Sequence, residues 1–286
     1  MGPKLMNRHL EAVTRVVGMG LLLSVCALAL AQGGAALMDP ASKVYVVATG
    51  QALASQVRIT NPAPTPQRFR LYLSDWNLNA GGNFDFFDSG TLERSASSWV
   101  TFPDSTVELA GFESRDIAYT VNVPADAEPG THWTVLFAEG EPSEPEPGQT
   151  AAAISVRVGH IIYVNVPELR SEGSVVGLFG APPTAAGRPY TVIAQYLNSG
   201  NAAQGVGGAF TLRNDRGETV IEATIDKSVV LPGGERAFQV NVMGPLPAGN
   251  YTALVVLNYG DDERDVAGSY DFLLSEPLGE PDTEGE

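Results

Sequence analysis

Residues 109–137 read LAGFESRDIAYTVNVPADAEPGTHWTVLF, and the plan of this stretch returns from residue 231 as LPGGERAFQVNVMGPLPAGNYTALVV. Each copy has a glycine turn, a run ending in VNV, a Pro/Gly turn followed by an aromatic residue, and a second apolar run. Short apolar runs separated by such turns are typical of paired β-strands. The repeat therefore predicts two copies of one β-domain, with the remaining strands of each copy around it.

Length and composition support an all-β protein of two domains. A chain of 286 residues is expected to form about two domains. Its 31 glycines and 20 prolines exceed average usage, and no sustained helical period follows the N-terminus, which indicates many turns between short strands. The net charge of −16 repels phosphate backbones and anionic lipid, so we expect no nucleic-acid partner and no attraction to a membrane surface.

Residues 1–31 have the pattern of a cleaved signal peptide. Basic residues precede an apolar run at residues 16–31, which ends in the small-residue cleavage motif Ala29-Leu30-Ala31. The run is shorter than the ~20 residues that span a bilayer, so a membrane anchor is disfavoured. We therefore expect a protein of the periplasm or cell surface, with no stable membrane insertion after cleavage. Cys26 is the only cysteine, so the mature domains are expected to fold without disulfides.

The first domain is placed at residues 43–167, after a small-residue lead-in at residues 32–42. Its strands are expected at residues 43–48, 53–60, 68–76, 99–102, 106–109 and 151–166, besides the pair in the opening stretch. Residues 77–83 form a Gly/Asn hairpin loop, and residues 139–150 a mobile Pro/Glu-rich loop.

The second domain is placed at residues 168–275, and an acidic disordered tail at residues 276–286. Seven strands are expected, at residues 175–179, 190–197, 209–212, 219–225, 237–242, 251–258 and 269–274. Seven short strands separated by turns are the pattern of an immunoglobulin-like β-sandwich. The predicted fold class is thus two tandem immunoglobulin-like sandwiches after a signal peptide.

One loop has the oxygen-rich composition of a calcium site. Asp75, Asn77, Asn79 and Asp85 are its candidate ligands. The position that would close such a loop with a bidentate carboxylate is Phe86, so a hairpin turn is the favoured interpretation and no metal is expected.

No residue pattern indicates catalysis. The chain has no GxSxG, no HExxH and no phosphate-binding glycine loop, so we expect neither enzyme activity nor a cofactor. His132 and His160 lie alone in strand-like runs, where a structural role is the usual one. Trp76, Trp99 and Trp133 would form a carbohydrate platform if exposed, but buried sandwich aromatics are more common.

Several motifs resemble those of the PapD-like periplasmic pilus chaperones in the broad sense. They are DWxL at residues 75–78, GTLxxSxSxW at residues 90–99, VNVP at residues 121–124 and PGTHW at residues 129–133. The resemblance covers roughly residues 43–167, with an immunoglobulin-like second domain behind it. It implies a non-enzymatic protein that holds surface-fibre subunits by β-strand addition.

The resemblance also implies a binding site on the last strand of the first domain. Residues 151–166 would be the strand offered to the client, with Ser155, Arg157, Ile161 and Tyr163 on the face away from the core. Lys43 and Arg157, matched by position, would anchor the client's carboxylate.

One alternative stays open: a structural or adhesive module that binds other envelope proteins or glycans. Its prediction is that Ile161 and Tyr163 pack on a neighbour.

Overall fold

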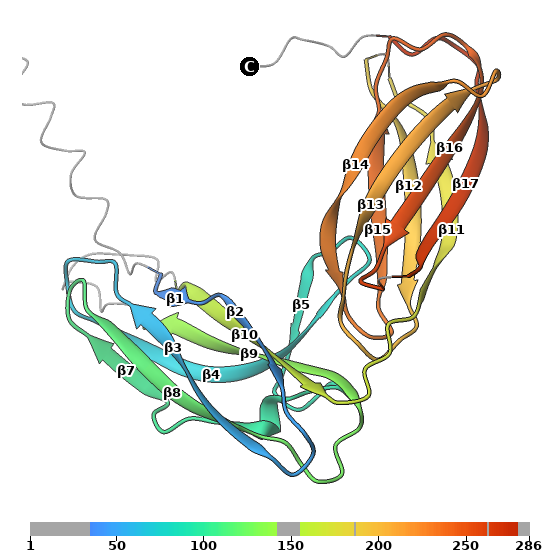
Figure 1. Ribbon diagram of the computed structural model, residues 1–286. Helices are drawn as coiled ribbons and strands as arrows, with labels where there is room; N and C mark the ends of the chain where they lie inside the picture. Colours follow the sequence, from blue (N-terminus) through green and yellow to red (C-terminus); the bar gives the residue numbers. More distant parts are fainter. Residues whose placement is uncertain (1–34, 142–154, 186, 262, 280–286) are drawn as a thin grey trace, which may run out of the picture.

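The computed structural model describes residues 35–141, 155–185, 187–261 and 263–279 (Figure 1). The regular structure of these residues is β throughout, apart from one 3-10 turn, η1 (Ser97–Trp99). None of them forms a helix that could cross a membrane. The predicted signal peptide, the greater part of the Pro/Glu-rich loop and residues 280–286 of the predicted tail lie outside the described residues.

The first sandwich consists of two facing sheets. Its strands are β1 (Leu37–Asp39), β2 (Ser42–Val46), β3 (Ala52–Thr60), β4 (Gln67–Leu78), β5 (Phe84–Phe87), β6 (Val100–Thr101), β7 (Thr106–Leu109), β8 (Ser114–Asn122), β9 (Gly130–Gly140) and β10 (Arg157–Val166). One sheet has the order β1-β3-β8-β6, and the other β2-β10-β9-β4-β5, with β7 also paired to β4. Alternating apolar side chains fill the space between them, including Ile59, Leu71, Tyr119 and Ile162.

The N-terminal strand crosses from one sheet to the other at Pro40. β1 pairs antiparallel with β3, whereas β2 pairs in parallel with β10. Buried His160 lies at the crossing: its Nδ1 is 2.7 Å from the carbonyl oxygen of Pro40, and its Nε2 is 2.9 Å from the Tyr119 hydroxyl. The core of the first sandwich therefore fixes where β2 joins the edge of β10.

The second sandwich contains all seven predicted strands. They are β11 (Gly173–Ala181), β12 (Tyr190–Asn198), β13 (Gln204–Asn214), β14 (Thr219–Val230), β15 (Glu235–Val242), β16 (Gly249–Asn258) and β17 (Asp265–Leu274). The sheets β11-β12-β15 and β14-β13-β16-β17 enclose a separate core. The prediction of two immunoglobulin-like sandwiches is confirmed. The fourth strand of this sandwich, β14, pairs with the third, β13. In the constant-type immunoglobulin arrangement these two strands belong to different sheets.

The predicted strand ends need correction in three places. The expected lead-in contributes β1, whose Met38 enters the core, because its backbone finds a partner in β3. β10 begins at Arg157 rather than at residue 151, since residues 155–156 are described and lie outside any strand. The expected tail begins later than residue 276, because buried Leu278 exchanges two backbone hydrogen bonds with Leu246, at 2.9 and 3.1 Å.

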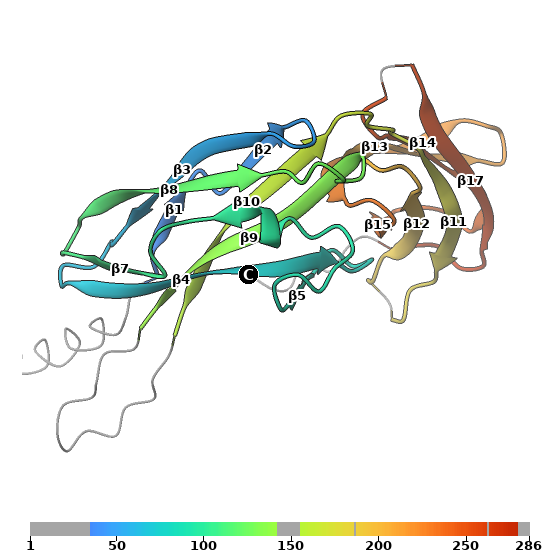
Figure 2. The same ribbon diagram turned by 90° about the horizontal axis from the view of Figure 1, so that it is seen from below.

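The two sandwiches meet at an angle, and the β4–β5 hairpin reaches from the first into that angle (Figures 1 and 2). The carbonyl oxygen of Ala80, in the hairpin loop, accepts a 2.8 Å hydrogen bond from the backbone N–H of Ala237 on β15. A Cβ atom built on Gly82 would overlap the guanidinium of Arg236. The hairpin tip is therefore seated against the second sandwich.

Candidate functional site

Part of the edge of β10 has no partner strand among the described residues. On one side β10 pairs with β9 along its whole length, and on the other β2 covers only Ile161 to Asn165. Val156 O accepts from Gly140 N on the β9 side, whereas Ile161 N donates to Ala41 O on the β2 side. Because peptide groups alternate along a strand, those of Arg157 and Gly159 face the side without a partner. A short open edge therefore remains at residues 157–160.

The prediction of an accessible edge along residues 151–166 is corrected accordingly. Within β10 the edge is open only over its first four residues, because the strand that crosses at Pro40 occupies the rest. Residues 151–154 lie outside the described residues.

Aromatic side chains cover the face of this sheet that points away from the first core. Trp76, Trp133, Val135 and Phe137 are buried there, together with Leu231 of the second sandwich; Tyr72, Leu78, Ile161, Tyr163 and Ala203 pack against them. We call these ten residues the elbow cluster. The two indole rings of the cluster lie 6.4 Å apart, edge to face.

Ile161 and Tyr163 belong to the elbow cluster and are not free side chains. Tyr163 meets Trp76 edge to face at 6.0 Å, and burial raises the pKa of its phenol to about 12. The sequence correctly placed both residues away from the first core, but their expected exposure is wrong. The physical reason is that the hairpin and the second sandwich cover this face near the angle.

An apolar pocket of about 260 Å³ lies between the elbow cluster and the open edge. Its apolar walls come from β4, β5, β9 and β10, namely from Trp76, Phe84, Phe86, Val135, Phe137 and Ile161. Gly159 and Arg157 of the open edge complete the lining. We call this cavity the edge pocket.

Arg157 forms the polar rim of the edge pocket. Its guanidinium carbon lies 4.4 Å from the ring centre of Phe137 and 4.7 Å from that of Phe86, both within cation–π range. One Nη is 3.4 Å from the Tyr72 hydroxyl. Among the described residues Arg157 takes part in no ion pair: Glu139, opposite it on β9, pairs with Arg70 at 2.7 Å.

Two of the other predicted binding residues are engaged within the chain. Ser155 Oγ lies 3.0 Å from Glu139 Oε1 and 2.9 Å from Gly140 O, just before β10. Lys43 Nζ donates to Ser55 Oγ at 3.1 Å and to Gln56 O at 2.9 Å, on the facing sheet.

Lys43 and Arg157 are not brought together. Lys43 is in register with Ile162, which points into the core, whereas Arg157 lies on the opposite face and five residues earlier in β10. Because neighbouring residues of a strand point to opposite faces, the two cations cannot bind one carboxylate as a pair.

The candidate calcium ligands have other partners. Asp75 is fully buried; its carboxylate accepts hydrogen bonds from Ser95 Oγ at 2.6 Å, Ser97 Oγ at 3.0 Å and Leu92 N at 2.9 Å. Asn77 Oδ1 accepts from Leu78 N and Asn79 Oδ1 from Asn83 N, while Asp85 is in register with Asn77 on β5. No group of three acidic or histidine side chains suited to a metal occurs in the described part of the chain. β4 and β5 pair antiparallel as a hairpin around this loop.

The histidines and tryptophans of the described residues are buried. His132 is buried against Trp99, with ring centres 4.4 Å apart, and its Nε2 is 3.0 Å from Glu128 O. Burial is the main cause of the lowered pKa of both His132 and His160. All three tryptophans are buried, which corrects the alternative of a tryptophan platform for carbohydrate.

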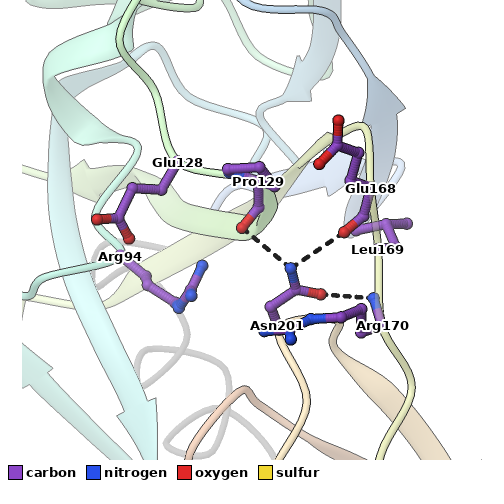
Figure 3. A pocket seen from close by; sticks show the side chains of 7 residues that line it. All are labelled: Arg94, Glu128, Pro129, Glu168, Leu169, Arg170 and Asn201. Atoms are coloured by element: carbon purple, nitrogen blue, oxygen red, sulfur yellow. Dashed lines mark hydrogen bonds between the residues drawn. The ribbon is translucent and has the colours of Figure 1, made fainter.

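The junction of the two sandwiches is held by Asn201, beside a pocket of about 670 Å³ (Figure 3). The Asn201 side chain donates to Pro129 O at 3.2 Å and to Glu168 O at 3.1 Å, and accepts from Arg170 N at 2.6 Å. Its backbone carbonyl accepts from Thr131 N at 2.8 Å. One buried amide thus connects β9, the linker and the second sandwich.

Sequence reasoning missed β5 and the close packing around Gly159. Residues 84–87 read FDFF, and the alternation that puts Phe84 and Phe86 on one face was visible, but no strand was assigned there. The close packing around Gly159 comes from Val135 and Phe137 of another strand, so no local pattern could reveal it.

Comparison with known proteins found no matching family model and no match among curated proteins. Similar solved structures are fimbrial chaperones, the kind of protein that the sequence motifs resemble. The class 5 fimbriae chaperone CfaA is 15% identical, with 85% of this chain and 100% of that chain covered and a TM-score of 0.45. The YadV chaperone is 10% identical (83% and 99% covered, TM-score 0.43) and the Pseudomonas aeruginosa CupB2 chaperone 12% (85% and 100%, 0.40). The two tandem sandwiches are defined by this chain's own strand order.

Proposed function

We propose that this protein is an exported, non-enzymatic assembly chaperone that holds an extended segment of a surface-fibre subunit by β-strand addition to the open edge of β10. The single observation that carries this proposal is that edge. The peptide groups of Arg157 and Gly159 have no partner strand among the described residues, and an apolar pocket opens beside them. Main-chain hydrogen bonds supply affinity in strand addition, and side-chain pockets supply specificity.

The position of the edge suits a partner that binds in line with β2. A segment bound to this side of β10 would lie end to end with β2, next to Ser42. β2 itself pairs in parallel with the following residues of β10. The surrounding sheet is rigid, because β10 is fully paired with β9 and its His160 is held by Pro40 and Tyr119. A partner would therefore find the edge preformed, which lowers the entropic cost of binding.

A structural or adhesive module remains the second candidate, and one observation favours it. Phe84, Phe86 and Phe87 of β5 are 40–50% exposed, so β5 itself presents aromatic surface to a neighbouring envelope protein. In that function the partner would contact β5 and leave the β10 edge unpaired.

The test uses a photo-crosslinking residue in cells that make the protein together with candidate fibre subunits. It is placed at Val156, beside the open edge, and as a matched control at Val220 on β14; these side chains are 39% and 38% exposed. Crosslinks to a subunit strand from position 156 and none from position 220 are expected. Equal crosslinking from both positions would overturn the proposal.

Two variants at position 157 distinguish the contribution of the backbone N–H from that of the Arg157 side chain. Arg157→Pro removes a peptide N–H that faces the open side, and no hydrogen bond to β9 is lost with it. Arg157→Ala removes the guanidinium and keeps the N–H. Subunit co-purification should be abolished by the proline and largely retained with the alanine. If the proline variant captures subunit as the original chain does, strand addition at this edge is wrong.

A further inference from the structure

Gly159 is closely packed by two side chains of β9, so no larger residue fits at this point of the open edge. A Cβ atom at this position would lie 2.6 Å from Val135 Cγ2 and 3.1 Å from Phe137 Cε1. Without one, these two side chains form the floor of the edge pocket, and the rings of Phe84 and Phe86, stacked at 5.8 Å, stand at its side. At this point β10 itself presents no side chain to the edge pocket.

We propose that the edge pocket binds one large apolar side chain, aromatic by preference, of the segment that adds to β10, and that Arg157 binds an acidic side chain two residues away from it. This inference rests on the proposed function, since the segment must first pair with the edge. It names the chemistry that would select the partner: an extended segment with an aromatic and an acidic residue on the same face.

The size and lining of the pocket fit a side chain. Its volume of about 260 Å³ is below the ~300–1,000 Å³ of typical small-molecule sites. Arg157 is the only charged residue of its lining among the described residues. Burial of an aromatic side chain in such surroundings strengthens binding by roughly tenfold or more.

The charge of Arg157 predicts the second feature of the partner segment, its acidic residue. Its flat guanidinium lies over the rings of Phe86 and Phe137, which contact each other edge to face, an arrangement that orients the group but leaves N–H donors at its edges. Arg70 and Ser155 already bind Glu139, the carboxylate in register with Arg157 on β9. A planar carboxylate from the partner matches this geometry.

The spacing of two residues between the aromatic and the acidic residue of the partner follows from the alternation of side chains along a strand. Arg157 and Gly159 lie on one face of β10, and residues that face the same side of a paired strand are also two apart. A partner residue opposite Gly159 would enter the pocket, and the residue opposite Arg157 would meet the guanidinium.

The experiment measures the binding of dye-labelled, capped peptides to the purified protein by fluorescence anisotropy. The test peptide alternates Thr and Val and carries Glu and, two residues later, Phe; a second peptide has the two in reverse order, because the direction of the added strand is open. Matched peptides replace Phe by Ala or Glu by Gln. Phe to Ala should weaken binding by about tenfold or more, and Glu to Gln by about threefold or more.

Adjacent residues of β5 provide matched protein variants. Phe86→Ala removes a pocket wall, whereas Phe87→Ala removes a ring of almost equal exposure, 41% against 40%, that does not line the pocket. Phe86→Ala should abolish the advantage of the Phe peptide, and Phe87→Ala should leave it unchanged. Equal loss with both variants would overturn the pocket assignment.

The remaining outcomes separate this inference from the proposed function. If the Phe and Ala peptides bind equally and Arg157→Pro weakens both, strand addition stands and the pocket inference is overturned. If no peptide binds, the inference is overturned, while crosslinking to subunits from position 156 decides the proposed function independently. A concentration-dependent dimer that is lost with Phe86→Ala would show that the pocket binds a second copy of this chain. That result would overturn the inference that it binds a segment of another protein.

Discussion

The Asn201 side chain of the second sandwich donates a 3.2 Å hydrogen bond to the carbonyl oxygen of Pro129 in the first, and the same amide group contacts the linker. Two bodies joined by one linker are held at a fixed angle only if buried polar groups or packed side chains join them on more than one side. Here the Asn201 side chain joins the two sandwiches beside the linker, and the hydrogen bond from Ala237 N to Ala80 O joins them at the β4–β5 hairpin tip.

Asn201→Ala should loosen this angle. The substitution leaves Pro129 O, Glu168 O and Arg170 N without their partner, which costs about 1–3 kcal/mol for each group that water does not reach. Small-angle X-ray scattering should show a broader distribution of interdomain distances. Asn198→Ala is the control, because that amide binds only within the second sandwich, to Ala202 O and Val230 O. If both variants scatter as the original chain does, Asn201 does not set the angle.

Changing Ile161 and Tyr163 to Ser should destabilise the protein. Both side chains pack in the elbow cluster, and the loss of buried aliphatic or aromatic groups costs about 2–5 kcal/mol per residue, less for partly buried positions. Urea unfolding should therefore show a clear loss of free energy of unfolding. Val44→Ser with Val46→Ser is the matched control on β2, where exposures of 63% and 71% predict a change within about 0.5 kcal/mol. An unchanged midpoint for the first pair would contradict the packing.

Asp75→Ala should release the segment from Leu92 to Ser97. Three donors lose a buried carboxylate, and hydrogen bonds to charged groups contribute about 1.5–3 kcal/mol each. Hydrogen exchange at Leu92 N should accelerate, while amides in β16 stay protected. The unsubstituted protein should melt at the same temperature with calcium or with EDTA. A saturable rise in melting temperature with calcium would instead show that the protein binds calcium.

The stability of the first sandwich should fall as the pH drops from about 7 towards 5. Burial lowers the pKa of His160, opposed by its contact with Pro40 O and assisted by the charge of Lys43; burial also lowers the pKa of His132. The unfolded chain, with histidine pKa values near ~6.5, binds more protons below that pH than the folded chain does. The free energy of unfolding is therefore unaffected by these groups above pH ~6.5 and decreases below it, until the lowered pKa values are passed.

The measurement is urea unfolding at a series of pH values between about 5 and 7, a range in which most carboxylates stay ionised. His160→Gln should flatten the dependence in part, although it also lowers stability through its lost contacts with Tyr119 and Pro40. A free energy of unfolding that is constant over this range would show that neither histidine is kept neutral by burial.

The sequence by itself determined the strands and their inner faces. A strand repeats every two residues, so alternation places Ile162 and Val164 in the core and Ile161 and Tyr163 on the other side without any knowledge of neighbours. The VNV repeat likewise marked β8 with β9 and β15 with β16, because each turn and its two strands are local in sequence.

Only the tertiary structure decided what covers those faces. The closure of part of the β10 edge depends on β2, more than a hundred residues earlier, and the burial of Tyr163 depends on a hairpin and a second sandwich. The separation of Lys43 from Arg157 and the close packing around Gly159 arise in the same way, from the register between strands that are distant in sequence. Local alternation specifies which side a residue faces, but which partner it meets there is set by contacts across the whole chain.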